Sequence, residues 1–414
     1  MPENDSGGDI MDGLPGGGDA FTETTSRSWL EKIVSSLKAI IIGLLLVIVA
    51  GVLLFWNEGR SARTSAALSE GSRSVVSIST DRIDAANDGK LIHVAGNTIV
   101  GAPARDTDLN FEANGLRLKR KVEMYQWKEE SQSETQKKLG GGEETVTRYT
   151  YKKEWSDRAI DSSRFRNVQD HRNPPMPATG ARTFYAADAK LGAFRLEEPV
   201  LQAIPGGDRF AVPDSAAAQV RSRLGPSARI LQGDVYVGAD PNQPSVGDVR
   251  MMWEVLPVMP VSVVGRQSQS TIKPWVAGNG NEVLLVEAGA VEPATMFRHG
   301  QESNEVLTWV LRLVGALLMF IGFRLMLSLL EALADVVPFF GNIAGAGASL
   351  MALLATMLVA PLLVALAWFF YRPLVAAGVL IAGAAIVYGL RRLMQARAAQ
   401  TAPAARPLPG APRG

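Results

Sequence analysis

Apolar residues are concentrated near the two ends of the chain. One uncharged run covers residues 39–56, and three more apolar runs cover residues 306–330, 343–370 and 374–390. As an α-helix the first run would extend about 27 Å, close to the hydrocarbon thickness of a bilayer. The pattern therefore predicts four transmembrane helices.

The third and fourth runs have features of their own. Pro361 interrupts the third run and removes one helical hydrogen bond, which predicts a kink. Gly and Ala near the start of the third run favour close helix packing. Only residues 371–373 separate it from the fourth run, so we expect a tight antiparallel hairpin of helices.

The residues between the first and second runs have the composition of a water-soluble domain. Residues 59–76 can prolong the first helix as a stalk, and short β-type runs separated by Gly, Pro and Asn follow from residue 90. We therefore predict a β-rich extramembrane domain over residues 57–305. The fold class is an α+β membrane protein, with four transmembrane helices and a large β-rich domain between helices 1 and 2.

A long β-hairpin is the clearest local prediction in this domain. Apolar residues alternate with charges over residues 116–124, a partner run covers residues 145–155, and three glycines separate them at 140–142. Its charged tip, residues 129–144, is either solvated or a docking surface.

Further elements follow along the domain. A helix is predicted over residues 216–224, and strands over 235–237, 249–256, 261–266 and 283–287. The similar strings at residues 96–102 and 233–239 raise the hypothesis of duplicated subdomains at about 90–180 and 228–290.

Charged residues beside the apolar runs predict the orientation. Arg27, Lys32 and Lys38 precede the first run, and Arg391, Arg392 and Arg397 follow the last. Because Lys and Arg favour the cytoplasmic side, both termini are predicted there and the large domain outside the cytoplasm. Residues 1–28 and 391–414 are predicted to be disordered tails, and residues 331–342 a cytoplasmic or interfacial loop.

Four charged residues near the second run form a candidate polar stripe. Arg312 and Arg324 each lie about six residues from an end of the run, so either can extend its guanidinium to the interface. Alternatively, Arg324 shares a helical face with Glu331 and Asp335 and forms an ion pair between helices or lines a polar path. Both interpretations stay open from the sequence.

The sequence contains no pattern that indicates catalysis or a cofactor. There is no cysteine, and His93, His171 and His299 lie far apart without metal-ligand spacing. No nucleophile elbow or phosphate-binding glycine loop is present. The net charge of +1 gives no basic surface for nucleic acid. We therefore predict no catalytic residues, no metal, no cofactor and no nucleic-acid partner.

Several short strings of the sequence are distinctive. Their positions are Asn57, Glu58, Gly59, Arg60, Glu123, Tyr125, Trp127, Tyr371, Arg372 and Pro373. In their order along about residues 45–390, these strings resemble the LUMA family, also called transmembrane protein 43.

The resemblance implies four spans, a large lumenal domain and a role in organising membrane protein complexes. For animal members it also implies self-association, the endoplasmic reticulum and inner nuclear membrane, and partners such as emerin and lamins. Arg-rich and Ala-rich composition is common in GC-rich bacteria, so we expect a bacterial cytoplasmic membrane with a periplasmic domain and do not carry those two partners over.

The function expected from the sequence is a non-enzymatic membrane scaffold. Its expected partners are the lipid bilayer, copies of the same chain and other membrane proteins. The alternative is an ion channel or channel subunit formed by oligomerised helices, and a membrane-bound hydrolase has less support.

Overall fold

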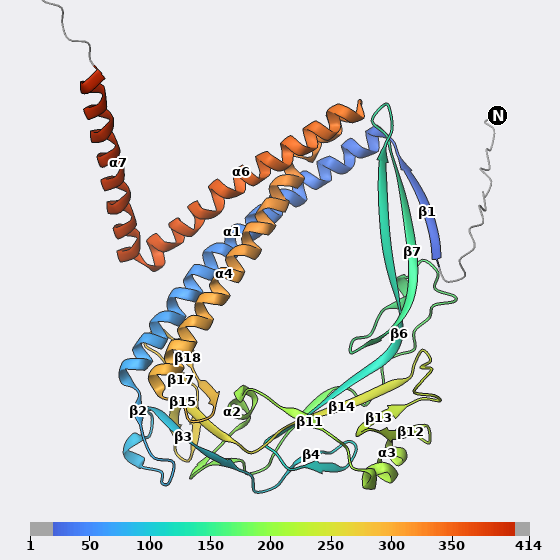
Figure 1. Cartoon of the computed structure of the whole chain (residues 1–414), viewed down its shortest axis with the longest axis vertical. Helices are drawn as coiled ribbons and strands as arrows, with labels where there is room; N and C mark the ends of the chain where they lie inside the picture. Colours follow the sequence, from blue (N-terminus) through green and yellow to red (C-terminus); the bar gives the residue numbers. More distant parts are fainter. Residues whose placement is uncertain (1–19, 402–414) are drawn as a thin grey trace, which may run out of the picture. The chain divides into compact units, whose positions relative to one another are not determined.

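The computed structural model describes residues 20–401, and the two predicted tails fall partly outside this range. The described residues divide into two compact units. The sheet unit comprises residues 20–32, 70–298 and 333–341, and the helical unit comprises residues 33–69, 299–332 and 342–401. Figure 1 shows their elements along the chain.

The helices include the four long apolar ones predicted from the sequence, each long and apolar enough to cross a membrane. The α-helices of the described residues are α1 (Trp29–Ser74), α2 (Glu198–Ala203), α3 (Ala217–Leu224), α4 (Pro293–Met326), α5 (Ser328–Ala334), α6 (Pro338–Tyr371) and α7 (Pro373–Thr401). Short 3-10 turns lie at η1 (Ala85–Asn87), η2 (Ser162–Arg164) and η3 (Asp214–Ala216).

The first long helix extends well beyond its apolar run at both ends. Ser28 accepts a hydrogen bond from the Glu31 amide, and the Glu31 side chain accepts one from the Ser28 amide, so a capping box begins α1. The helix continues to Ser74, which confirms the predicted stalk.

Two larger sheets make up most of the sheet unit. The eight-stranded sheet has the order β1 (Ala20–Arg27), β7 (Glu143–Ser156), β6 (Arg117–Lys137), β14 (Val249–Leu256), β13 (Asp234–Val237) and β12 (Ala228–Leu231), with β8 (Arg182–Tyr185) paired to β6 and β11 (Asp208–Phe210) paired to β14. The seven-stranded sheet has the order β19 (Leu285–Ala288), β15 (Pro260–Ser268), β16 (Thr271–Lys273), β10 (Phe194–Arg195), β9 (Lys190–Leu191), β3 (Leu91–Ile99) and β2 (Val76–Ser77), and β15 also pairs with β3.

Two small hairpins complete the strands: β4 (Ala104–Asp106) with β5 (Phe111–Ala113), and β17 (Trp275–Val276) with β18 (Glu282–Val283). Residues 90–180 and 228–290 each contribute strands to both larger sheets. The hypothesised duplication therefore does not divide this unit into two separate subdomains.

One hydrophobic core joins the two larger sheets. Leu118, Val122 and Met124 on β6, Trp253 on β14 and Ile92 on β3 all belong to this core and are almost completely buried. The side chains of β6 alternate between this core and the opposite face, because successive residues of a strand point to opposite sides. The predicted hairpin is confirmed, with β6 and β7 antiparallel from Met124 opposite Ser156 to Lys137 opposite Glu143.

The predicted disordered tail is wrong for its described part. Residues 20–27 form β1, which pairs antiparallel with β7 from Ala20 opposite Thr150 to Arg27 opposite Glu143. Residues 1–19 of that tail lie outside the described residues. At the other end, α7 continues the helix through residues 391–401, and residues 402–414 lie outside the described range.

The hairpin tip contacts the start of α1 and the connection between α5 and α6. Asp335, 1% exposed, forms ion pairs with Lys32 and with Lys137, whose Nζ lies 2.8 Å from Oδ1. Lys32 also lies 3.1 Å from Glu143, and the Gly140 amide donates to the Val336 carbonyl. Burial would raise the pKa of Asp335, but hydrogen bonds from Lys137 and Lys32 and their charges bring it below its usual value. Lys137 and Glu143 are thus held by contacts within the chain, whereas residues 130–136 and 138–140 are exposed, as the solvated alternative expects.

The pairing of β1 with β7 joins two segments that the predicted orientation places on opposite sides of the membrane. Lys32, one of the cations used for that prediction, forms ion pairs with Asp335 and Glu143.

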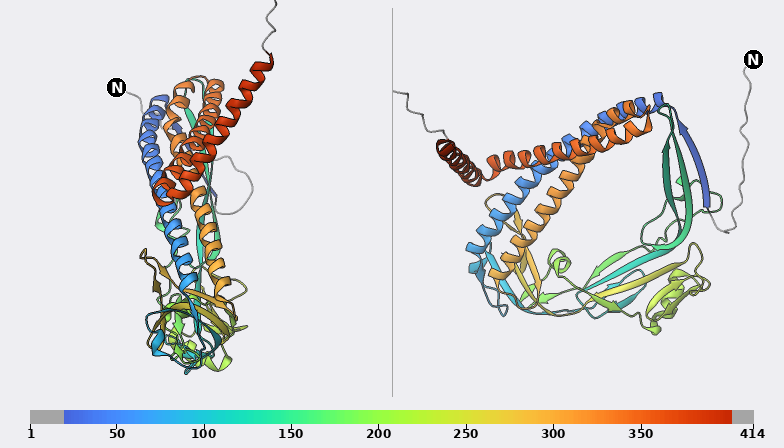
Figure 2. Two further views of the ribbon diagram at one scale, coloured as in Figure 1. Left: turned by 90° about the vertical axis from the view of Figure 1, so that its left-hand side faces the viewer. Right: turned by 45° about the horizontal axis from the view of Figure 1, so that its top comes forward.

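In the helical unit, α1 and α4 run side by side (Figures 1 and 2). A Cβ atom on Gly43 would lie 2.5 Å from the carbonyl oxygen of Gly322, so the two backbones approach closely where both residues lack side chains. The fourth long helix is different: α7 turns away from α6 at Pro373 and diverges from it (Figures 1 and 2). The predicted tight antiparallel hairpin is therefore wrong, since only 6% of the apolar window of α7 is buried.

Candidate functional site

A buried polar cluster lies in the helical unit, where α1, α4 and α6 meet. Asn57 and Glu58 follow directly after the apolar run of α1, yet they are 0% and 1% exposed. A buried carboxylate is costly unless it is paired and hydrogen-bonded. The partners of these residues therefore define the cluster.

Glu58 is held by two side chains from different helices. Arg312 on α4 donates from Nε to Oε1 at 2.6 Å and from Nη2 to Oε2 at 2.9 Å, and the indole Nε1 of Trp368 on α6 donates to Oε2 at 2.8 Å. The Arg312 guanidinium also lies 4.6 Å from the ring centroid of Trp309. This fork-like pairing is the strongest geometry available to Arg and a carboxylate.

Arg60 forms the second half of the cluster without a carboxylate partner. Its Nη1 donates to Oδ1 of Asn304 at 2.9 Å, and its Nη2 donates to Oγ1 of Thr308 at 3.0 Å and to Oδ1 of Asn57 at 3.3 Å. Asn304 in turn donates to the Ser61 carbonyl oxygen at 3.1 Å. The Arg60 Nε atom is buried without a hydrogen-bond partner in the described structure.

The end of α6 closes the cluster. A Cβ atom on Gly59 would lie 2.7 Å from the Tyr371 ring, so the helices approach closely there only because residue 59 is glycine. Arg372 Nη2 donates to the Ser61 hydroxyl at 3.2 Å, and Pro373 begins α7. The fold thus brings together two strings that are more than 300 positions apart in the sequence. One string is Asn57, Glu58, Gly59 and Arg60, and the other is Tyr371, Arg372 and Pro373.

The other string positions, Glu123, Tyr125 and Trp127, lie on β6 in the sheet unit. Glu123 pairs with Arg250 on β14. The Tyr125 ring packs 5.2 Å from Trp155, and the Trp127 ring lies 4.4 Å below the Lys153 ammonium. These contacts stabilise the strand pairing and are separate from the polar cluster.

The predicted polar stripe does not form one site. Arg312 pairs with Glu58, whereas Arg324 pairs with Glu331 on α5 and donates to the Ser349 hydroxyl at 3.0 Å. Asp335 belongs to the sheet unit. Arg312 and Arg324 therefore form ion pairs between helices rather than snorkelling to the interface. Arg312, the pair of Arg324 with Glu331, and Asp335 lie in three separate places.

Some residues of the cluster were not predicted from the sequence. Asn304 and Thr308 precede Arg312 at spacings of four residues, a helical stripe that was visible in the sequence. Trp368 had no such signal, because an aromatic residue near the end of an apolar run is typical of a membrane interface. In the part of the chain that the structure describes, no group of three or more His, Asp or Glu side chains could hold a metal ion.

The fold and the cluster together define an integral, multi-pass membrane protein with four apolar helices and a sheet-rich region between the first and the second. The family model for transmembrane protein 43 matches residues 124–373. The chain belongs to this family.

Similar proteins cover most of the chain. The human protein named transmembrane protein 43 is 30% identical over 380 residues, which cover 88% of this chain and 92% of the human one. The mouse protein of that name is 30% identical over 369 residues, covering 86% and 90%, and a Drosophila melanogaster homologue is 28% identical over 353 residues, covering 83% and 91%. No solved structure matches the chain.

Proposed function

We propose that this protein is a non-enzymatic membrane scaffold, in which the β-rich domain binds other membrane proteins and the helices anchor it and associate with further copies of the chain. The names of the relatives state no enzymatic activity, which supports this direction. The localisation that we propose is a bacterial cytoplasmic membrane, with the domain in the periplasm.

The observation that carries the proposal is the way in which the polar cluster uses its charges. Glu58 accepts hydrogen bonds from Arg312 and Trp368, and Arg60 donates hydrogen bonds to three neutral oxygen atoms. A general acid or base needs a proton that it can exchange with a substrate, whereas these groups bind each other across three helices. Such an arrangement fixes helix positions, which is what an anchor for binding partners requires.

Self-association is supported by α7. Gly378, Ala382, Ala385 and Gly389 recur at helical spacing on one face of this helix, and small residues let a second helix approach closely in a membrane. A Cβ atom on Gly378 or Gly389 would meet nothing within 4 Å, so this face is open within the chain.

The proposal is tested by the oligomeric state of the full chain and by the proteins that crosslink to it. We expect a dimer or larger oligomer in mild detergent and other membrane proteins among the crosslinked species. Gly378→Ile with Gly389→Ile should shift the chain to monomers, whereas Gly383→Ile, which lies on another face of α7, should not. Finding only monomers, with no membrane protein crosslinked, would count decisively against a scaffold.

The side of the membrane can be tested separately, because the sequence has no cysteine. We expect Ser133→Cys on β6 to react with an impermeant maleimide added to intact cells, because the proposed orientation places the domain in the periplasm. A Ser133→Cys protein that reacts only after the cells are permeabilised would overturn this orientation.

The channel alternative has weaker support. Arg324, the central residue of that hypothesis, is engaged by Glu331 and Ser349. The groove between α4 and α6 beside it is lined almost entirely by apolar side chains, which would not stabilise a hydrated ion.

A further inference from the structure

A polar cavity adjoins the buried cluster. It has a volume of about 350 Å³, and its lining includes Ser61, Asn304, Arg312 and Arg372. This volume lies within the range of about 300–1,000 Å³ that is usual for small-molecule sites. The cavity lies beside the ends of the apolar runs of α1 and α6, where a membrane helix meets water.

An apolar groove continues from this cavity between α4 and α6. Its first part, about 580 Å³, shares Trp309, Arg312 and Trp368 with the polar cavity. Its second part, about 610 Å³, shares Leu313 and Pro361 with the first. The shared residues place the three spaces next to one another along α4 and α6, as a path with a polar end and an apolar body.

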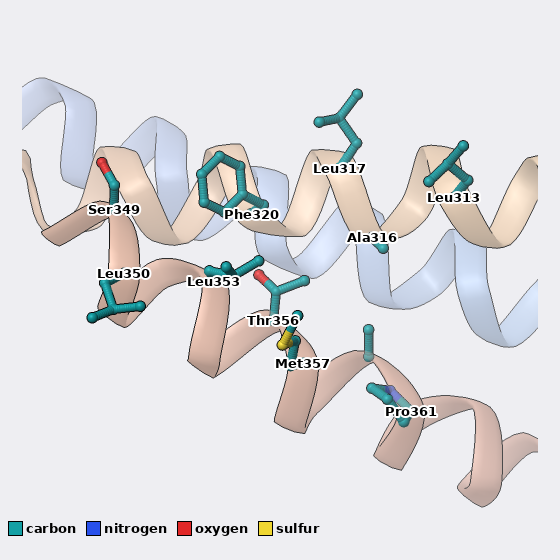
Figure 3. A pocket seen from close by; sticks show the side chains of 11 residues that line it. Leu313, Ala316, Leu317, Phe320, Ser349, Leu350, Leu353, Thr356, Met357 and Pro361 are labelled. Carbon is teal, nitrogen blue, oxygen red and sulfur yellow. The ribbon is translucent and has the colours of Figure 1, made fainter. Parts of the chain in front are cut away.

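The shape of the groove follows from the two helices. Figure 3 shows Leu313, Ala316 and Phe320 on α4 and Leu353 and Pro361 on α6, with the helices diverging toward Pro361. Because Pro361 cannot donate a helical hydrogen bond, it favours a bend there. From Trp368 to Ser349 the groove follows α6 for about 28 Å at 1.5 Å per residue, which is about the thickness of the hydrocarbon core.

The polar end carries excess positive charge. The guanidinium groups of Arg60, Arg312 and Arg372 lie in or beside it, against the carboxylates of Glu58 and Glu305. Glu58 is bound by Arg312, and in the described residues neither Arg60 nor Arg372 pairs with a carboxylate. An anionic group that entered the cavity would therefore find a cation whose charge is not yet compensated.

We propose that this path binds one anionic phospholipid, with its phosphate in the polar cavity near Arg372 and one acyl chain along the groove between α4 and α6. The charge selects the headgroup, and the apolar body of the groove selects the chain. A free phosphate would use only the first part of the site, and an apolar protein helix only the second. This inference is independent of the proposed scaffold function.

The experiment uses the purified, delipidated full chain in detergent. The probes are dioleoyl phosphatidylglycerol, dioleoyl phosphatidylcholine and glycerol phosphate, which separate the contributions of charge and acyl chain. Native mass spectrometry counts bound lipids, and the shift in thermal unfolding temperature measures stabilisation. We expect one tightly held phosphatidylglycerol per chain, bound roughly tenfold more tightly than phosphatidylcholine, and no comparable shift with glycerol phosphate.

Variants distinguish the two parts of the site. Arg372→Gln should abolish most of the preference for phosphatidylglycerol and Arg372→Lys should keep it, whereas Arg392→Gln, which removes an exposed arginine on α7, should change nothing. Ala316→Phe should fill the groove and weaken both lipids, whereas Ala384→Phe on the exposed face of α7 should not. The unfolding temperature of each lipid-free variant shows whether it is folded.

Three outcomes would overturn the proposal. Equal binding of the two lipids by the unaltered chain would leave only non-specific surrounding lipid. A shift with glycerol phosphate equal to that with phosphatidylglycerol would reduce the site to a phosphate pocket. Unchanged lipid binding by folded Ala316→Phe would remove the groove from the site.

Discussion

Each unit of this protein buries one carboxylate beneath an arginine and a tryptophan. In the sheet unit, Asp106 accepts hydrogen bonds from Arg120 at 2.7 and 2.8 Å and from the Trp253 indole at 3.1 Å. In the helical unit, Glu58 accepts from Arg312 and from the Trp368 indole. Both carboxylates are at most 1% exposed. The same solution to burying a negative charge is used in a water-soluble core and among membrane helices.

The two sites differ in how completely the charges of their arginines are compensated. Asp106 also accepts from the amides of Asp108 and Leu109, and Arg120 has a second carboxylate partner in Asp108. The cluster at Glu58 contains two further arginines without carboxylate partners and adjoins a polar cavity. A site with compensated charges serves stability, whereas one with excess positive charge can also bind an anionic ligand.

The largest effect is expected when the Asp106 site loses its buried negative charge. Asp106→Asn removes the buried one of the two carboxylates that pair with the Arg120 guanidinium, which is 1% exposed, and should lower the free energy of unfolding by about 3–5 kcal/mol. Urea unfolding of the full chain in detergent, followed by tryptophan fluorescence, measures this loss. The matched control is Glu112→Gln, which breaks a half-exposed pair with Arg105 and should cost at most about 1 kcal/mol. Equal costs for the two variants would remove the distinction between buried and surface pairs.

A smaller effect is expected from steric crowding at the Glu58 cluster. Gly59→Ala places a Cβ atom 2.7 Å from the Tyr371 ring, so the end of α6 must shift. The expected cost is about 1–3 kcal/mol, typical of overpacking, and is read as a lower thermal unfolding temperature in detergent. Gly347→Ala, also within a long helix, meets nothing within 4 Å and should be neutral or slightly stabilising. A Gly59→Ala protein as stable as Gly347→Ala would show that α1 and α6 do not pack tightly here.

The smallest effect is a pH dependence of the ion pair between Asp108 and Arg120. A hydrogen bond from Arg120 is the main reason why the pKa of Asp108 is lowered. Because the folded-state pKa lies below the unfolded-state value of about 3.9, this stabilisation is complete at higher pH and is lost as the pH falls through the folded-state pKa.

The Asp108 side chain is 33% exposed, so solvent keeps the contribution small. We expect the unfolding temperatures of the unaltered protein and of Asp108→Asn to differ at pH 6 and to converge toward pH 3. A difference that stays constant over this range would show that Asp108 stabilises the fold by means other than its charge.

Local patterns in the sequence were sufficient for many elements. The four apolar helices and the β6–β7 hairpin follow from hydropathy, alternation and turn glycines, and the strand predicted at residues 249–256 matches β14. These signals are encoded within a few neighbouring residues, which is why a single sequence reveals them.

Contacts between distant segments could not be predicted in this way. The strand β1 consists mostly of polar residues, and its partner β7 begins more than 100 positions later, so composition alone indicated disorder. Arg120 lies on the same face of β6 as the core residues, so the alternation along the strand indicated that it needs a buried partner. No neighbouring residue in the sequence identified Asp106 as that partner. The same holds for Glu58, whose partners Arg312 and Trp368 come from two later helices.

Glu58 and Arg312 act as one unit that holds α1 against α4. A double-mutant cycle with Glu58→Gln, Arg312→Gln and the combined variant, measured by unfolding in detergent, tests this coupling most directly. We predict that the combined loss is smaller than the sum of the single losses by about 2 kcal/mol, because each single change leaves a buried charge without its partner. Strictly additive losses would contradict the account.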